Sequence, residues 1–117
     1  MFRLEARSQE LEAALMDRIA LLTEVLSQNP TDAFARYGLA MEYSNSGDVE
    51  RALEEFGNLL TAHPDYTAGY FMAAQTLAKA DRITEAKTML ADGIVSAKKT
   101  GNGHAQAEME GMLAELL

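Results

Sequence analysis

Apolar residues recur every three or four positions along most of the chain, which is the spacing of one face of an α-helix. The helical pattern stops at short polar segments that contain proline or glycine, and it starts again after each of them. The pattern predicts six antiparallel helices, near residues 4–28, 32–45, 49–62, 66–79, 83–99 and 104–116. The expected fold class is therefore all-α.

Positions 34 residues apart keep the same size of side chain. Pro30 and Pro64 are separated by this interval, and each follows a helical pattern and precedes an aspartate that can cap the next helix. Three apolar series share the interval: Leu15, Val49 and Ile83; Leu22, Phe56 and Leu90; Leu26, Leu60 and Ile94. Two pairs of small residues share it as well: Ala40 with Ala74, and Ala52 with Ala86. The sequence thus predicts a repeated unit.

The central unit resembles the tetratricopeptide repeat family, whose helix-turn-helix unit has a period of 34 residues. The positions that match the family pattern are Leu39, Ala40, Tyr43, Ala52, Phe56 and Pro64. Arg36 stands where the pattern has a large aromatic residue, so we expect Tyr37 or Phe34 to take over its packing. The following unit is more degenerate, because it keeps Tyr70 and Ala86 but has Leu77, Leu90 and Lys98 at the Tyr, Phe and Pro positions.

The resemblance implies a single right-handed superhelical domain over residues 1–117. Residues 1–30 would form an N-terminal helix or half repeat. Residues 31–64 and 65–98 would form two full repeats, and residues 99–117 a C-terminal capping helix. Terminal helices of this kind are expected because a repeat unit cannot bury its own apolar face alone.

The turns inside the two repeats differ in their chemistry. In the first turn, Gly47 is expected to end one helix and Asp48 to cap the next. The corresponding turn at Asp81-Arg82 has no glycine, so we expect it to be less ideal. Gly101-Asn102-Gly103 follows two lysines and is typical of a helix stop.

Composition excludes several classes of partner. Eighteen acidic against ten basic residues give a net charge of −8, which opposes binding to nucleic acids and to anionic membranes. The absence of cysteine removes disulfides, thiolate nucleophiles and cysteine zinc sites. No targeting segment or long apolar stretch is evident in the sequence, so we expect a cytoplasmic protein.

The sequence offers little for catalysis. His63 and His104 are isolated from each other, and each is expected to be structural or solvent-exposed. Glu50, Glu54 and Glu55 are interpreted as the solvated outer face of a helix rather than as an acid-base or metal cluster. We therefore predict a protein without catalytic residues, metal ions or cofactors.

Binding is the predicted function. In the family that the chain resembles, the first helix of each unit lines a concave groove. Carried onto this sequence, the groove would contain Phe34, Tyr37, Met41, Ser44, Asn45, Ala68, Phe71, Gln75 and Lys79. Lys79 is the one cation among them, which disfavours acidic peptide tails and favours an apolar or amphipathic segment of a protein partner. For Tyr37 and Phe71, packing between neighbouring helices is the alternative role.

A structural role is the alternative function, in which the chain assembles with itself or caps a larger scaffold. The first predicted helix carries apolar residues at heptad-like spacing: Leu4, Leu11, Leu15, Leu22 and Val25. Its first turns are expected to overhang the repeats and to leave Leu4 and Leu11 exposed. A homodimer through this helix, or through the groove, would follow, whereas the identity of a different protein partner is not encoded in any motif.

Overall fold

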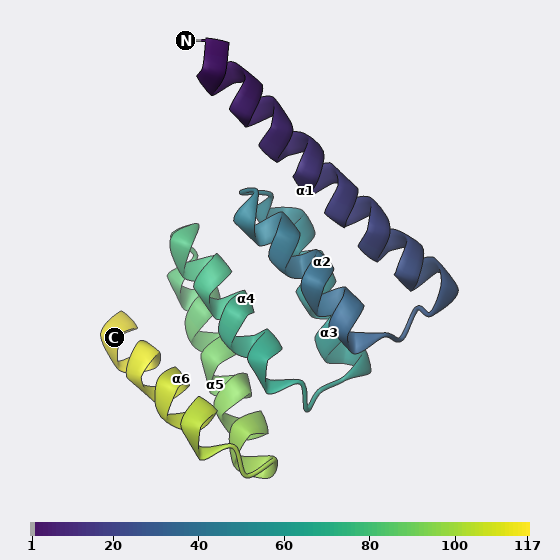
Figure 1. Ribbon diagram of the computed structural model, residues 1–117. Helices are drawn as coiled ribbons and strands as arrows, with labels where there is room; N and C mark the ends of the chain where they lie inside the picture. Colours follow the sequence, from purple (N-terminus) through teal and green to yellow (C-terminus); the bar gives the residue numbers. More distant parts are fainter. Residues whose placement is uncertain (1) are drawn as a thin grey trace.

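The computed structural model describes residues 2–117, with side chains from residue 6 onward, and forms six consecutive antiparallel helices (Figure 1). They are α1 (Phe2–Gln28), α2 (Ala33–Asn45), α3 (Val49–Ala62), α4 (Thr67–Lys79), α5 (Ile83–Lys99) and α6 (Gly103–Leu116). The predicted all-α fold is confirmed, and every helix begins and ends within two residues of its predicted bounds.

The helices form two layers with different spacing. Each helix packs on the next, and in addition α2 contacts α4 and α4 contacts α6. In the described part of the chain, by contrast, no Cα atom of α3 lies within 8 Å of a Cα atom of α5. A stack of two layers curves toward the more closely spaced one, so α2, α4 and α6 form the concave side. Figure 1 shows α2 in front of α3 and α4 in front of α5.

Three of the turns between helices, those joining α2 to α3, α4 to α5 and α5 to α6, use the left-handed backbone conformation. Gly47 and Gly101 adopt φ values of 84° and 70°, which glycine reaches without a steric penalty. Asp81 occupies the same kind of position with φ of 61°, a conformation that is uncommon for residues other than glycine. The prediction that the second turn is less ideal is therefore confirmed.

Side-chain caps fix the start of three helices. The carboxylate of Asp32 accepts a hydrogen bond from the backbone N–H of Ala35 at 3.0 Å, and Asp48 accepts one from Arg51 at 3.3 Å. Asn102, which the sequence pattern assigned only to a helix stop, also caps α6 by accepting from Ala105 at 3.1 Å. The cap at Asp32 is the reason that α2 begins one residue later than predicted.

The core combines small residues at helix crossings with larger side chains, among them Leu59 and Met109. Ala40, Ala52, Ala74 and Ala86 are fully buried, as are the large side chains Phe56 and Leu90. These residues belong to the series with the 34-residue interval, so the interval marks core positions. Small side chains at a crossing let helix axes approach closely, and the large residues fill the remaining space.

Gly93 of α5 marks the tightest approach. A Cβ atom at this position would lie 2.5 Å from Sδ of Met109 and 2.6 Å from Cβ of Tyr70. Because Tyr70 Cβ is fixed by the backbone of α4, this contact cannot be relieved by a side-chain rotation. Helices α4, α5 and α6 therefore meet at a point where only glycine fits.

Arg36 replaces the expected aromatic residue by making polar contacts. Its guanidinium donates to Glu55 at 2.9 Å and to the carbonyl oxygen of Pro30 at 3.0 Å. The prediction that Glu55 lies on the solvated outer face is therefore wrong, since its side chain is only 15% exposed and bridges α3 to α2. Tyr37 packs on Phe56 as expected, whereas Phe34 does not take over this packing.

The first half of α1 extends beyond the other helices, as Figure 1 shows. Ile19, Leu22 and Leu26 pack on α2, and residues 6–13 are all exposed. Leu11 is 66% exposed, which confirms that part of the predicted overhang. Leu4 lies outside the described side chains.

Two glycine-to-alanine substitutions should change stability in opposite directions. Gly93→Ala should lower the free energy of unfolding by about 1–3 kcal/mol, because it overpacks the site where α4, α5 and α6 meet. Gly57→Ala should raise it by up to about 1 kcal/mol, because Gly57 lies inside α3 and an added methyl group would meet no neighbouring heavy atom within 4 Å. Urea unfolding followed by circular dichroism measures both; a loss of stability in both variants would contradict the assigned packing.

Candidate functional site

Two of the predicted groove residues of α2 lie in very different environments. Phe34, in the first turn of the helix, is 78% exposed. Tyr37, one turn later, is half-buried, with its ring 6.5 Å from Phe56 and 5.3 Å from Tyr66 between ring centroids. Burial, and to a smaller extent the neighbouring Tyr66, raises the pKa of Tyr37, so its hydroxyl stays protonated and able to donate at neutral pH.

The concave face continues onto α4 through a hydroxyl pair. Ser44 Oγ and Thr76 Oγ1 are 2.7 Å apart, and Thr76 donates its own proton to the carbonyl oxygen of Met72 at 2.9 Å. Ser44 is therefore the donor of the pair. This bond joins the C-terminal halves of α2 and α4 where the predicted residues Asn45 and Lys79 are both exposed.

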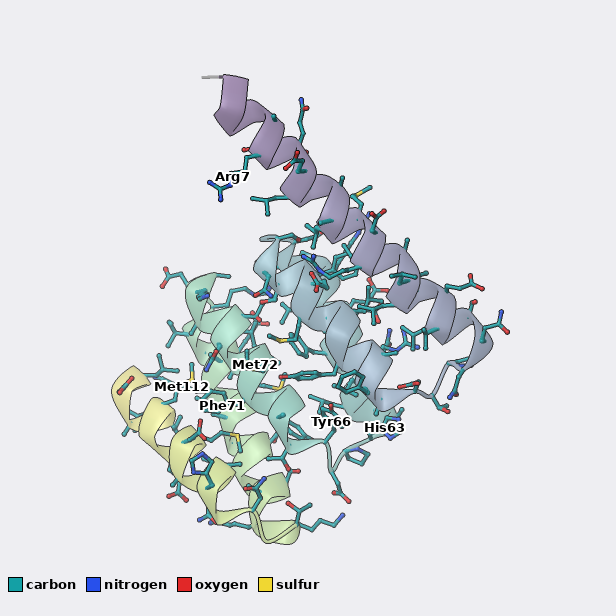
Figure 2. The ribbon with its side chains drawn as sticks, viewed as in Figure 1. Arg7, His63, Tyr66, Phe71, Met72 and Met112 are labelled. Carbon is teal, nitrogen blue, oxygen red and sulfur yellow. The ribbon has the colours of Figure 1, made fainter. Side chains whose placement is uncertain are left out.

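Helix α6 completes a groove that the sequence pattern described only in part. Phe71 and Gln75 of α4 line a hollow of about 440 Å³. Its other wall consists of α6 residues: Ala107, Glu108, Gly111, Met112 and Glu115. Figure 2 shows Phe71 and Met112 on the facing sides of α4 and α6. The sequence pattern predicted a capping helix over residues 99–117, but it gave no sign that Met112 also lines the groove.

The predicted site residues thus fall into two groups. Tyr37 and Met41 pack with Met72 against the cluster around Phe56, between α2 and α4. Phe71 packs with Met112 against the cluster around Leu90, between α4 and α6. Tyr37 and Phe71 therefore contribute to helix packing as well as to the concave face. Phe34 is 78% exposed and belongs to neither group.

The concave face carries charged side chains on α4 and on α6. Lys79 is at the end of α4, and Glu108 and Glu115 are on α6. Of the groove residues predicted on α2 and α4, Lys79 alone carries a charge, and α6 adds the carboxylates of Glu108 and Glu115. The sequence pattern indicated only a capping role for residues 99–117, so these carboxylates were not predicted as part of the face.

The two histidines have structural or solvent-exposed positions. His63 Nε2 lies 2.8 Å from the carbonyl oxygen of Thr31, which can only accept, so Nε2 carries the proton and links the end of α3 to the turn before α2. His104 is exposed beside Glu108. Among the described side chains, residues 6–117, no group of three or more potential metal ligands is close enough to hold an ion.

The helices of the described chain include none that is both long enough and apolar enough to span a membrane. The long helix α1 carries charged residues along its length, such as Arg7, Glu12 and Asp17.

Comparison with known proteins agrees with the geometry. Family models described as tetratricopeptide repeat match residues 43–115 and residues 21–54. A TPR repeat-containing protein of Pseudomonas aeruginosa is 28% identical over 95 residues, which are 81% of this chain and 90% of that protein. The solution structure of a tetratricopeptide repeat domain protein from Salinibacter ruber is 30% identical with a TM-score of 0.70, covering 75% of this chain and 89% of that one.

A more distant structure shares the fold over nearly the whole length. The TPR2B domain of yeast Sti1, solved as a complex with pHsp70, has a TM-score of 0.81 at 16% identity and covers 97% of this chain and 91% of that chain. The repeated interval, the two-layered stack of antiparallel helices and the matching family models lead to one conclusion: the chain belongs to the tetratricopeptide repeat family.

Proposed function

We propose that the protein binds an apolar or amphipathic segment of a protein partner on the concave face formed by α2, α4 and α6. The residues proposed to make contact are those predicted from the sequence, Phe34, Tyr37, Met41, Asn45, Phe71, Gln75 and Lys79, together with Met112. Family members serve as protein-interaction modules, and the yeast relative named above was solved with a bound partner. The proposal assigns no chemical reaction to the chain.

The observation that carries the proposal is the hollow between Phe71 and Met112. Phe34, one helical turn before Tyr37 on α2, adds a ring that is 78% exposed. Exposed aromatic and methionine side chains at a concave surface supply large contact areas, and such residues dominate binding energy in protein interfaces. A buried role alone would not leave Phe34 with 78% of its surface in water.

Charge indicates what kind of segment fits. The concave face offers one lysine against the two carboxylates of Glu108 and Glu115. An acidic tail would lose its hydration without gaining enough cationic partners, and it would meet like charges on α6. A segment with apolar anchors and no excess of acidic residues is therefore favoured.

The division of the chain into an N-terminal half repeat (1–30), two repeats (31–64 and 65–98) and a capping helix (99–117) remains part of the proposal. It is supported by the burial of Ala40, Ala52, Ala74 and Ala86 at equivalent positions. In this division α1 acts as the second helix of an incomplete first unit.

Removing the exposed ring of Phe34 tests the concave face with little risk to folding. Phe34→Ser should weaken binding of a peptide selected from a random library against the wild-type chain by roughly tenfold or more, the usual effect of losing an aromatic anchor. Isothermal calorimetry measures the affinity. Tyr37→Ser with Phe71→Ser should have a larger effect, with some loss of stability because both rings also pack between helices.

Val95→Ser is the matched control, because Val95 is 66% exposed on α5, which is not part of the concave layer. Its affinity for the selected peptide should equal that of the wild type. Equal binding by the Phe34 variant, the double variant and the control would refute the concave face as the binding site. If the Phe34 variant binds more weakly than the control, affinity capture from the native lysate with the same variants would identify the natural partner.

Self-association through α1 is a second candidate, favoured by one specific observation. Leu11, Leu21 and Val25 are exposed by 66%, 67% and 41%, although they lie on a helix of a folded domain. Leu11 and Val25 are two heptads apart, and Leu21 lies at the d position between them, so the stripe suits a helix of the same spacing in a second copy.

The stripe can be tested by light scattering after size exclusion. If α1 mediates pairing, the wild-type chain should have the mass of a dimer and the Leu11→Ser/Leu21→Ser variant that of a monomer. Both side chains are mostly in water, so the substitutions should leave the helical circular dichroism unchanged. A wild-type chain that is monomeric at high concentration would eliminate this candidate.

A further inference from the structure

We infer that the groove between α3 and α5, on the convex side, is a second docking surface that accepts a cationic amphipathic helix of a partner protein. The groove has a volume of about 700 Å³, which is within the range of ligand pockets in proteins. It lies on the layer opposite the concave face, so the inference does not depend on the proposed function.

The curvature of the stack opens this groove. Because α2 and α4 lie close together on the concave side, α3 and α5 are forced apart on the convex side. The Cα atoms of α3 stay more than 8 Å from the Cα atoms of α5 along their described lengths. The floor that becomes visible between them is apolar. It consists of Leu53 of α3, Leu77 of α4 and Met89 of α5, while Gly57 leaves one wall without a side chain.

One end of the groove is closed by ion pairs. Arg82, just before α5, bonds Glu50 of α3 at 2.6 Å and both oxygens of Glu85 at 2.8 and 2.9 Å. This arginine ties the two walls together at the N-terminal ends of α3 and α5. These ion pairs therefore connect the two walls at this end of the groove.

The rim of the groove is acidic. Four carboxylates, those of Glu50, Glu54, Glu85 and Asp92, line it with the guanidinium groups of Arg51 and Arg82. Arg82 is paired with Glu50 and Glu85, and Arg51 pairs with Asp48 at 3.7 Å outside the groove.

Glu54 on one wall and Asp92 on the other take part in no ion pair among the described residues. The free charge that faces an incoming ligand is thus negative on both sides of an apolar floor.

The apolar floor and the acidic rim together determine which kind of segment fits the groove. An apolar stripe of a helix would cover Leu53, Leu77 and Met89, and lysine or arginine residues on each side of the stripe would reach Glu54 and Asp92. Two parallel helices form a natural cradle for a third helix that packs ridges into grooves. An acidic amphipathic helix would cover the apolar floor but would be repelled by the carboxylates of the rim. A purely apolar helix would leave these carboxylates without cationic partners.

A synthetic peptide of leucine and lysine, about 18 residues long with leucines at helical spacing, provides the probe. It carries a nitroxide at one end, and a counterpart has glutamate in place of every lysine. Methyl NMR spectra of the full chain should show paramagnetic broadening of Leu53, Leu77 and Met89 with the lysine peptide. The glutamate peptide should leave these methyl signals unchanged.

Charge reversal at the rim separates specific docking from general attraction to an acidic protein. Glu54→Lys/Asp92→Lys should raise the dissociation constant of the lysine peptide roughly tenfold. The control Glu10→Lys/Asp17→Lys makes the same change in net charge on exposed positions of α1 and should have a much smaller effect. Gly57→Leu, which fills the groove from an open wall, should abolish the broadening while the helical circular dichroism is retained.

The inference is overturned if the lysine peptide does not bind, if both charge variants weaken it equally, or if the glutamate peptide binds as well. Broadening at Met41, Met72 and Met112 in place of Leu53 and Met89 would also overturn it. That last result would place the peptide on the concave face and leave the proposed function intact. Failure of the Phe34 variants, in turn, has no bearing on the α3–α5 groove.

Discussion

The close approach of successive helices at small residues is the constraint on which the rest of the structure depends. Ala52 and Ala86 are buried at equivalent crossings, and Gly93 lies where even a methyl group would collide with the neighbouring helix. Interiors are packed as densely as organic crystals, so a helix held this close cannot shift without losing contacts. The distance between helices and the curvature of the stack follow from these crossings.

The same constraint produces two faces with different properties. In the layer of α2, α4 and α6, Tyr37 and Met41 pack between α2 and α4, and Phe71 and Met112 line a hollow between α4 and α6. The layer of α3 and α5, whose helices lie further apart, leaves an acidic groove with an apolar floor between them. We propose that these two surfaces bind different partner segments, and that the fold acts by positioning them.

The architecture could be predicted well because the repeated interval records core contacts directly. The alanine pairs and Phe56 with Leu90 recur at the interval and are all buried, and Gly47 and Asp48 identified a turn from local backbone chemistry. Long-range features were harder to predict. Glu55 looked like a surface residue because its partner Arg36 is nineteen positions away, and Met112 joins the concave face only because α6 packs beside α4. No local pattern carries information of that kind.

The measurement that tests the close helix crossings most directly is urea unfolding of Ala86→Leu beside Ala91→Leu. These are two substitutions of equal chemistry in α5, the first at a buried position and the second at an exposed one. We expect Ala86→Leu to lower the free energy of unfolding by about 1–3 kcal/mol and Ala91→Leu to leave it nearly unchanged. Equal unfolding midpoints for the two variants would contradict the close crossing at Ala86.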